Sequence, residues 1–397
     1  MNYQEFFEQE IDKIKEEGRY RVFANVKRIT GSFPKAIVQM NGISKEATLW
    51  CSNDYLGMGH NADVLEEMSR VILSSGSGAG GTRNISGTTP YHTLLEEELA
   101  KWHKCDSALV FTSGYVANET TLSTLASKIP ECIVLSDALN HASMIEGISH
   151  SRARKFIFRH NDMDHLKSFL DQIPKYQPKI IAVESVYSME GDVAPLDEIL
   201  DLARKYQALT YVDEVHAVGM YGDDGAGKIH EMNLDGEFDL IQGTLGKAIG
   251  CIGGYIAGGK SIVDFVRSFS PGFIFTTALP PAITSGALKS IQILKNASDL
   301  RAVHQEAVTQ TKQALSKAGL PFLDHYTHII PFIIGDAAKC KEISKTLFQE
   351  FGIYVQPINY PTVPKGSERF RITPTPYHTK EDIDHLVKAL SLLMKEL

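Results

Sequence analysis

The stretch FDLIQGTLGKAIGCIGGYIAG, residues 238–258, holds two short apolar runs with a lysine among glycines between them. Neither FDLIQG (238–243) nor GGYIAG (253–258) alternates polar and apolar residues, which is typical of strands buried on both faces. Five further runs of this kind lie upstream: SALVF (107–111), CIVL (132–135), KFIF (155–158), KIIAVE (179–184) and LTYVDE (209–214). Helical patterns such as 195–206 separate some of these runs. The alternation predicts an α/β fold with a largely parallel sheet between helices.

The pattern changes after about residue 285. We expect a long helix over roughly 285–318, mixed strands at 328–334, 353–357 and 369–373, and a final helix at 380–396. At the other end, residues 3–17 space their apolar side chains on one helical face, which indicates an arm that packs on another surface. The sequence therefore predicts an N-terminal arm at 1–55, a large domain at 56–285 and a small α+β domain at 286–397.

Composition excludes several classes of protein. The 397 residues include 40 basic and 48 acidic side chains, so no basic surplus favours nucleic acid as a partner. Five cysteines at wide spacings and without a C-x-x-C motif favour neither a disulfide framework nor a zinc site. The pair His325 and His328 lacks neighbouring acidic ligands, so we expect no metal centre. The acidic, amphipathic N-terminus is unlike a signal peptide, and we expect a cytoplasmic protein.

One uncharged stretch, residues 268–288, has about the length of a membrane span. It contains three prolines, two glycines and several hydroxyl side chains. This composition favours buried loop and strand over a spanning helix, so we expect no membrane association.

Two nucleotide-binding patterns occur in contexts that do not fit them. The G-x-G-x-x-G match at 76–81 follows a helical pattern rather than a strand. The P-loop match at 254–261 places the strand Tyr255–Ala257 after its first glycine, whereas a P-loop follows its strand. Neither pattern therefore favours a dinucleotide-binding enzyme or an NTPase.

Four polar groups follow the predicted strands. Lys247 lies among glycines just after 238–243, and a lysine buried there loses its charge easily and can form a Schiff base. Asp213 ends the run LTYV, where its carboxylate could hold a protonated pyridine nitrogen, and His216 could reach the phenolic oxygen of the same ring. Because ligands bind at the carboxyl ends of strands in such sheets, we expect these groups to share one site.

Two more strand ends supply the rest of such a site. His141 follows the strand at 132–135, and its flat imidazole could stack on a planar ring. Residues 112–115 end another strand and open a helix whose amides offer an anion site, and the Thr244 hydroxyl could add to it. Together these groups supply what pyridoxal 5'-phosphate (PLP) requires.

Longer motifs carry a resemblance to a known family over roughly residues 2–395. The most specific are EGRYRVF (17–23), WCSNDYLGM (50–58), GGTRNISGTTPYH (80–92), SDALNHASMIEGI (136–148), ESVYSMEGD (184–192), VDEVHAVGMYG (212–222), GTLGKAIG (243–250), PGFIFTTALPP (271–281) and the stretch 352–376. In these motifs the chain resembles the α-oxoamine synthases, which are PLP-dependent transferases of fold type I. The resemblance implies a seven-stranded, mostly parallel sheet and a homodimer with shared active sites.

Within that family the chain is similar to the branch that joins glycine and succinyl-CoA into 5-aminolevulinate, the first step of haem and tetrapyrrole biosynthesis, with release of CoA and CO2. The resemblance implies that Lys247 holds PLP covalently and serves as acid and base, and that His141 stacks on the ring. Asp213 would pair the pyridine nitrogen and His216 the phenolic oxygen. The implied cofactor site is completed by Gly114, Tyr115, Ser188 and Thr244, with Thr276 and Thr277 reaching the phosphate of the neighbouring subunit.

The resemblance also assigns the two substrates. Arg371 would bind the glycine carboxylate through its two-pronged guanidinium, with Asn53 helping to position that substrate. An arginine beside two neutral donors suits a second carboxylate, and the resemblance assigns the succinyl group to Arg21, Thr82 and Asn84. It assigns contacts with the CoA ester to Ser136, Lys155 and Thr362.

Three alternatives remain open at the level of the sequence. A sister α-oxoamine synthase would use acetyl-CoA or another acyl-CoA and make an aminoketone. A cyclising aminolevulinate synthase of secondary metabolism would share nearly every motif. A catalytically silent partner subunit of the same fold usually lacks the lysine, and Lys247 is present.

Overall fold

The computed structural model describes residues 1–17 and 19–396, so that Gly18 of the EGRYRVF motif and Leu397 of the expected small domain lie outside it. The chain forms two compact units. The large unit comprises residues 56–188 and 192–301, and the small unit comprises residues 1–55, 189–191 and 302–397.

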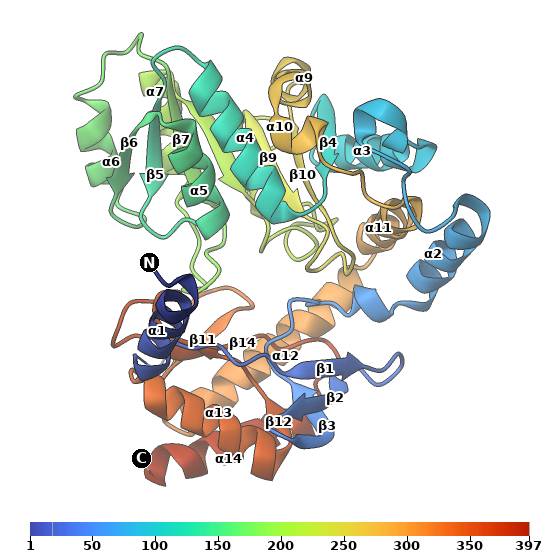
Figure 1. The fold of residues 1–397 in the computed structure, drawn as a ribbon, viewed down its shortest axis with the longest axis vertical. Coiled ribbons are helices and arrows are strands. Elements are labelled where there is room, and N and C mark those ends of the chain that lie inside the picture. Colours follow the sequence, from blue (N-terminus) through green and yellow to red (C-terminus); the bar gives the residue numbers. More distant parts are fainter. Residues whose placement is uncertain (18, 397) are drawn as a thin grey trace. The chain divides into compact units, whose positions relative to one another are not determined.

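The large unit is built on a seven-stranded sheet (Figure 1). In spatial order its strands are β4 (Ser107–Phe111), β10 (Gly254–Gly258), β9 (Leu240–Thr244), β8 (Leu209–Asp213), β7 (Lys179–Glu184), β5 (Ile133–Asp137) and β6 (Arg154–Phe158). β10 is antiparallel to both of its neighbours, and the other pairs are parallel. The expected seven-stranded, mostly parallel sheet is therefore confirmed, and each of its strands coincides with one of the seven apolar runs.

The unalternated runs have a simple physical origin, because helices cover both faces of the sheet. On β5, Val134 packs in a cluster with α4 (Gly114–Lys128), α5 (Ala142–Ser151) and α9 (Lys260–Phe269). Its neighbours Ile133 and Leu135 pack in another cluster with α6 (Met163–Leu170) and α7 (Leu196–Tyr206). Since successive side chains point to opposite faces, both faces of such a strand favour apolar residues, and the strand shows no alternation.

The remaining helices of the large unit are α2 (Ala62–Ser75), α3 (Pro90–Trp102), α8 (Lys228–Glu231), α10 (Pro271–Ile274) and α11 (Pro281–Leu294), with short turns at η1 (Met58–His60) and η2 (Arg83–Gly87). α11 packs against α2 and α3. The expected domain boundary at 285/286 is therefore wrong, because α11 belongs to the large unit, which ends at Arg301.

The single long helix expected over 285–318 is also wrong. Two helices occupy this range, α11 and α12 (Ser298–Lys317), with a break at residues 295–297. Arg301 Nη1 donates to the carbonyl oxygen of Leu294 at 2.6 Å. A side chain from α12 thus satisfies a carbonyl at the end of α11, where the helix leaves such groups unpaired.

The uncharged stretch 268–288 forms loop and helix rather than the expected loop and strand. Pro271 and Pro281 each occupy the first turn of a helix, where the missing N–H of proline has no cost. The only extended pairing here among the described residues is a single bridge between Thr277 and Thr82. None of the helices described is long and apolar enough to cross a membrane.

The small unit contains two further sheets. One has the order β1 (Asn25–Arg28), β2 (Lys35–Met40), β3 (Ile43–Leu49) and β12 (Ile353–Tyr354), and the other has the order β11 (Ile330–Ile333), β14 (Arg369–Ile372) and β13 (Pro357–Ile358). The helices α13 (Ala337–Phe351) and α14 (Lys380–Glu396) complete it. The expected strand at 353–357 is divided between β12 and β13, which lie in different sheets.

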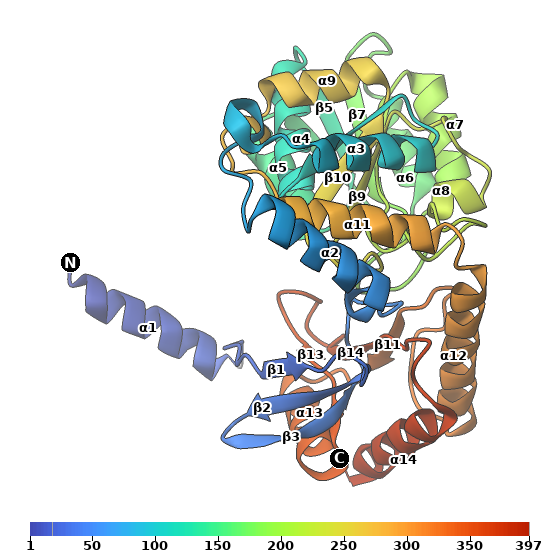
Figure 2. The ribbon, with the colours of Figure 1, turned by 90° about the vertical axis from the view of Figure 1, so that its right-hand side faces the viewer.

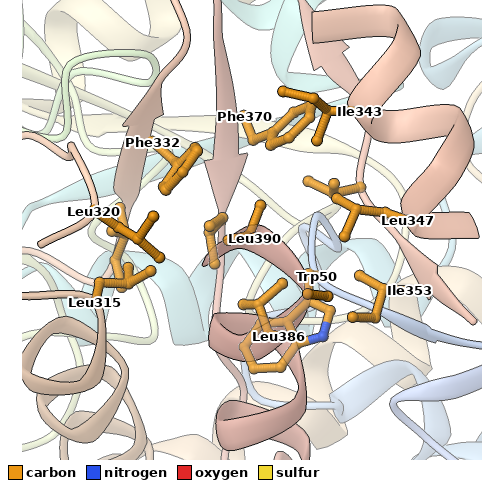
Figure 3. Close-up of a cluster of buried hydrophobic side chains, with 14 of the residues drawn as sticks. Trp50, Leu315, Leu320, Phe332, Ile343, Leu347, Ile353, Phe370, Leu386 and Leu390 are labelled. Atoms are coloured by element: carbon orange, nitrogen blue, oxygen red, sulfur yellow. The ribbon is translucent and has the colours of Figure 1, made fainter. Parts of the chain in front are cut away.

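The core of the small unit joins distant parts of the chain. Trp50, Phe332, Phe370, Leu347 and Leu386 lie in one buried cluster (Figure 3). Trp50 comes from the N-terminal segment, which explains why residues 1–55 belong with the C-terminal part of the chain. By contrast, α1 (Tyr3–Glu16) buries none of its residues. It precedes β1 at the start of the small unit (Figure 2).

Candidate active site

Asp213 lies at the carboxyl end of β8 and is 3% exposed. Its Oδ2 accepts a hydrogen bond from Asn118 Nδ2 at 2.7 Å, and its Oδ1 accepts one from the Val215 backbone N–H at 2.8 Å. Burial raises the pKa of Asp213, whereas these two donors and the positive charges of His141 and Lys247 lower it. The carboxyl group is thus held in the protein interior, and the charges of two other predicted residues, His141 and Lys247, act on it.

Asn118 of α4 organises the groups around Asp213. Its Oδ1 accepts from the Tyr211 hydroxyl at 2.8 Å, and its Nδ2 also donates to Ser143 Oγ at 3.0 Å. Ser143 in turn contacts His141 Nδ1 through its hydroxyl at 2.7 Å and donates its backbone N–H to the same nitrogen at 3.2 Å. Since His141 Nδ1 accepts that backbone N–H, the proton of a neutral ring lies on Nε2.

Sequence reasoning missed the side-chain roles of Asn118, Ser143 and Tyr211. Asn118 and Tyr211 are separated by 93 positions, so their contact leaves no local pattern. One signal was available in the sequence, because Asn118 is a polar residue in the first turns of a helix that follows a strand of the sheet. The structure shows that Asn118 is 1% exposed. A buried amide needs partners, and polar groups at this edge of the sheet supply them.

The loop that carries His216 is fixed by Glu214. Glu214 Oε2 accepts from Ser185 Oγ at 2.8 Å and from the Lys228 backbone N–H at 3.0 Å, and its Oε1 accepts from the Ile229 N–H at 2.8 Å. Burial raises the pKa of Glu214 to about 7, against the lowering effect of these donors. His216 is buried two residues later.

Lys247 lies in the loop after β9 and is half-buried. Its carbonyl accepts from the Gly250 N–H at 2.8 Å, which closes a turn around it. Gly250 has a φ of +76°, and a Cβ there would come within 2.2 Å of the Gly59 backbone nitrogen. Glycine is therefore required at this corner, for both its φ and the close backbone approach.

The predicted anion site lies at the start of α4. Ser113 caps this helix by accepting from the Val116 N–H at 3.1 Å. A Cβ on Gly114 would lie 3.1 Å from Thr244 Oγ1, so the helix start and the strand end of β9 are in close contact. Thr244 Oγ1 accepts from the Gly246 N–H at 3.1 Å and donates to the Gly253 carbonyl at 3.0 Å.

Two other predicted cofactor residues lie in the large unit. Tyr115 is half-exposed, and its ring centroid lies 6.4 Å from that of His141 in an edge-to-face arrangement. Ser188 is half-buried and follows Tyr187 after β7.

Thr276 and Thr277 lie in the loop before α11. Thr277 pairs with Thr82, and the N–H of the following Ala278 donates to the Gly81 carbonyl at 3.0 Å. Asn84 is exposed in the turn of η2 that follows Thr82. The structure therefore brings Thr277 beside a residue predicted for the succinyl group, and both belong to the large unit.

The small unit holds the predicted glycine-binding arginine. Arg371 on β14 is 7% exposed, and it donates to Asn53 Oδ1 at 2.9 Å and to the Tyr55 hydroxyl at 2.5 Å. Burial raises the pKa of Tyr55, and the Arg371 charge lowers it. The predicted pair Arg371 and Asn53 is thus in contact, and Tyr55 is a neighbour that sequence reasoning missed.

Arg21 and Thr362, predicted to contact the succinyl group and the CoA ester, also lie together in the small unit. Arg21 Nη2 donates to Thr362 Oγ1 at 3.4 Å. Both line a cavity of about 590 Å³ that also includes Phe23, Lys341 and Tyr360. The cavity offers cations and aromatic faces together.

The remaining two predicted residues are on β5 and β6. Lys155 is exposed, and its Nζ donates to Ser149 Oγ at 3.0 Å. Ser136 is 1% exposed, and its hydroxyl accepts from Asn140 Nδ2 at 2.9 Å. Ser136 therefore holds the residue before His141, and its predicted contact with the CoA ester stays a prediction.

Comparison with known proteins identifies the relatives of this chain. A family model for class I and II aminotransferases matches residues 45–390. The chain is 57% identical over 393 residues to the 5-aminolevulinate synthase of Rhizobium meliloti, covering 99% of this chain and 97% of that one. It is 53% identical over 390 residues to the 5-aminolevulinate synthase of Bradyrhizobium diazoefficiens, covering 98% and 95%.

A solved structure with lower sequence identity has a similar fold. The structure of SPT with a PLP internal aldimine superposes with a TM-score of 0.91 at 28% identity and covers 98% of this chain and 97% of that one.

Proposed function

The chain belongs to the class I and II aminotransferase family, and on that premise we propose that it condenses glycine with succinyl-CoA to form 5-aminolevulinate, releasing CoA and CO2. The observation that carries this function is the 57% identity to a 5-aminolevulinate synthase over nearly the whole of both chains. The matched region spans 393 residues and 99% of this chain, so it extends over both units.

The residues at the sheet edge fit PLP. Asp213 is a buried carboxyl group held by neutral N–H donors, which suits a protonated pyridine nitrogen. Gly114 and Thr244 are in contact at a helix start, which suits a phosphate. When bound, PLP supplies an electron sink for negative charge at the α-carbon of glycine.

Lys247 acts at the centre of the proposed reaction. Its amine would hold the cofactor, and as a free amine it would remove a proton from the α-carbon of glycine and later return one. Asp213 would pair with the pyridine nitrogen of the cofactor. His141 would stack on the ring, and its Nε2–H could donate to an oxygen on which negative charge develops. His216 and Ser188 would help to hold the ring from their own loops.

The substrates are distinguished by two arginines. Arg371 binds the carboxylate of glycine, and Asn53 and Tyr55 hold its guanidinium without neutralising its charge. Arg21, Thr82 and Asn84 bind the succinyl carboxylate. Lys155 and Thr362 contact the CoA part of the second substrate.

We further propose that the enzyme is a homodimer in which Thr276 and Thr277 complete the cofactor site of the other copy. Within one chain, Thr277 pairs with Thr82, a residue assigned to the succinyl group. A cytoplasmic location is part of the same proposal.

The experiment that tests the function combines absorbance and product formation. The wild-type protein, incubated with PLP, should acquire an absorbance band. Borohydride reduction should abolish this band and leave the cofactor attached to the peptide that contains Lys247. It should then release CoA and form 5-aminolevulinate from glycine and succinyl-CoA. Acetyl-CoA and butyryl-CoA serve as competing donors, and preference for either would point instead to a sister α-oxoamine synthase.

Lys247→Ala should retain its fold and lose turnover by at least about a thousandfold, since it removes the proposed acid and base. Lys289→Ala is the matched control, because that lysine is a partly exposed helix residue 3.9 Å from Asp63. Near-normal turnover by Lys247→Ala would reject the assignment.

A further inference from the structure

His160 lies between two carboxylates of the large unit. Its Nδ1 is 2.9 Å from Asp137 Oδ1, and its Nε2 is 2.8 Å from Asp192 Oδ2. The Tyr187 ring packs edge-on against the imidazole, with 4.4 Å between centroids. The His160 side chain is 21% exposed and that of Asp137 is fully buried, so this is not a solvent-exposed ion pair.

The geometry favours a charged His160. A neutral imidazole carries one N–H, and its other nitrogen would direct a lone pair at a carboxylate. Both nitrogens face carboxylate oxygens, and the imidazolium is the form of the ring that donates to both. Hydrogen bonds and charges from Asp137 and Asp192 raise the pKa of His160 to about 10, against the lowering effect of burial, which is the largest single contribution.

The two carboxylates belong to segments that lead to different site residues. Asp137 ends β5, and its Oδ1 also accepts from the Leu139 N–H at 2.8 Å, which shapes the turn before His141. Asp192 follows Ser188, and its backbone carbonyl accepts from the Tyr187 N–H at 3.0 Å. His160 therefore ties together the turn that presents His141 and the segment that presents Ser188.

Asn161 reinforces the same junction. Its backbone N–H donates to Asp137 Oδ2 at 2.9 Å, and its Nδ2 donates to Asp192 Oδ2 at 3.0 Å. Both carboxylates thus receive donors from two consecutive residues of the loop after β6. An imidazolium donates from both ring nitrogens, whereas a neutral imidazole donates from one, so a charged His160 holds both segments more firmly than a neutral ring would.

We propose that His160 is a positioning residue of the cofactor site: as an imidazolium clamped between Asp137 and Asp192, it sets the positions of His141 and Ser188 for PLP. This inference rests on the proposed function of the same site. It assigns His160 no contact with PLP or substrate.

The first test measures PLP binding by fluorescence titration of the apoprotein. His160→Gln removes the charge and leaves donors on one side only, because the amide oxygen is an acceptor, and it should raise the Kd for PLP at least tenfold, or ~1.4 kcal/mol. His150→Gln is the matched control, because His150 also lies between two acids, Glu119 and Glu146, but is 60% exposed on α5. The control should leave the Kd within about twofold.

The second test is the pH dependence of PLP affinity, which a merely structural role would not shift. The groups facing His160 are Asp137 from β5, and Asp192 and the Tyr187 ring from the segment after β7, while its own loop contributes the Arg159–Asp162 ion pair. In the wild type, the contribution of charged His160 to PLP affinity should be lost as pH rises through about 10. Asp192→Asn removes one carboxylate, so this loss should begin at least one pH unit lower.

The outcomes separate this inference from the proposed function. A wild-type protein that binds no PLP would reject the proposed function itself. A wild-type protein that binds PLP, with His160→Gln binding equally well, would overturn the role of His160. If His160→Gln does not fold, the pH dependence of PLP affinity in Asp192→Asn decides. A loss of affinity with its midpoint at the wild-type pH rejects the role of His160, and a midpoint at lower pH supports it.

Discussion

At the scale of the residue, the site depends on buried polar side chains that satisfy one another. Asn118 shows this most clearly, because a single amide connects Asp213, Ser143 and Tyr211. Its donor to Asp213 is a charge-assisted hydrogen bond when that carboxyl is ionised. Removing it would leave a buried carboxylate with one fewer donor and a buried hydroxyl without its acceptor.

We therefore expect Asn118→Leu to weaken PLP binding by roughly 1.5–3 kcal/mol, the range for hydrogen bonds to charged groups. Its pH optimum for PLP binding should also move upward, because the pKa of Asp213 rises when a donor that lowers it is removed. Thr124→Ala is the control, since Thr124 is a buried polar residue of the same helix whose hydroxyl has no hydrogen-bond partner. Equal affinities for PLP in the two variants would contradict the role of Asn118.

Arg371 supports a second prediction at this scale. Arg371→Lys replaces a planar fork by a point charge, so the KM for glycine should rise at least tenfold, ~1.4 kcal/mol, while the KM for succinyl-CoA changes little. Arg28→Lys is the matched control, because Arg28 forms a 3.4 Å ion pair with Asp54, the residue after Asn53. Steady-state kinetics with each substrate varied in turn provides the measurement. An equal rise in both KM values would argue against specific binding of glycine.

At the scale of the element, glycines set how closely β10 approaches α4. A Cβ on Gly254 would lie 2.5 Å from both the nitrogen and the Cα of Gly114, which opens α4. Both atoms belong to the backbone, so the contact can be relieved only by moving the strand or the helix. The start of α4 is the proposed phosphate site, so this packing bears directly on cofactor binding.

Gly254→Ala should therefore lower the free energy of unfolding by roughly 1–3 kcal/mol, as overpacking does, and also weaken PLP binding. Gly259→Ala lies just beyond the other end of β10, where a Cβ has no neighbour within 4 Å, and it should change neither quantity. Chemical denaturation and PLP titration measure the two effects. A stable Gly254→Ala variant with wild-type PLP affinity would show that this contact is not required.

At the scale of the whole molecule, buried histidines link stability to pH. His378 packs on Trp50 with 3.9 Å between ring centroids. Its Nδ1 accepts from the Thr375 N–H at 2.9 Å, and its Nε2 lies 3.1 Å from the Leu49 carbonyl. Burial lowers the pKa of His378 to about 4, because protonation would place a charge in the core and remove the acceptor for Thr375.

The folded-state pKa of His378 lies below its unfolded value of about 6.5, so its contribution to stability is complete above pH 6.5 and is lost as pH falls towards 4. His378→Gln should be less stable than the wild type at pH 7 and should lose roughly 3 kcal/mol less between pH 6.5 and 4. His385→Gln, at an exposed position on α14, serves as control. Urea denaturation at several pH values measures the free energy of unfolding of the wild type and the two variants. Parallel pH profiles for all three proteins would refute the prediction.

Much of the fold was determined by the sequence alone. All seven strands of the large sheet coincide with unalternated apolar runs, because burial on both faces is a local property of a strand. The positions of Asp213, His141, Lys247 and Gly114 at or after strand ends were likewise predicted, since the end of a strand is visible in the sequence. The resemblance to a known family supplied the assignment of roles, which periodicity could not give.

Tertiary structure decided the features that depend on distant residues. The break between α11 and α12, the membership of α11 in the large unit and the division of 353–357 between two sheets all follow from packing. The contacts of Asn118 with Asp213 and of His160 with Asp192 join residues 95 and 32 positions apart. Side-chain periodicity reports burial but not the identity of a partner. The sequence therefore determined where the site lies, and the fold determined which side chains hold it in place.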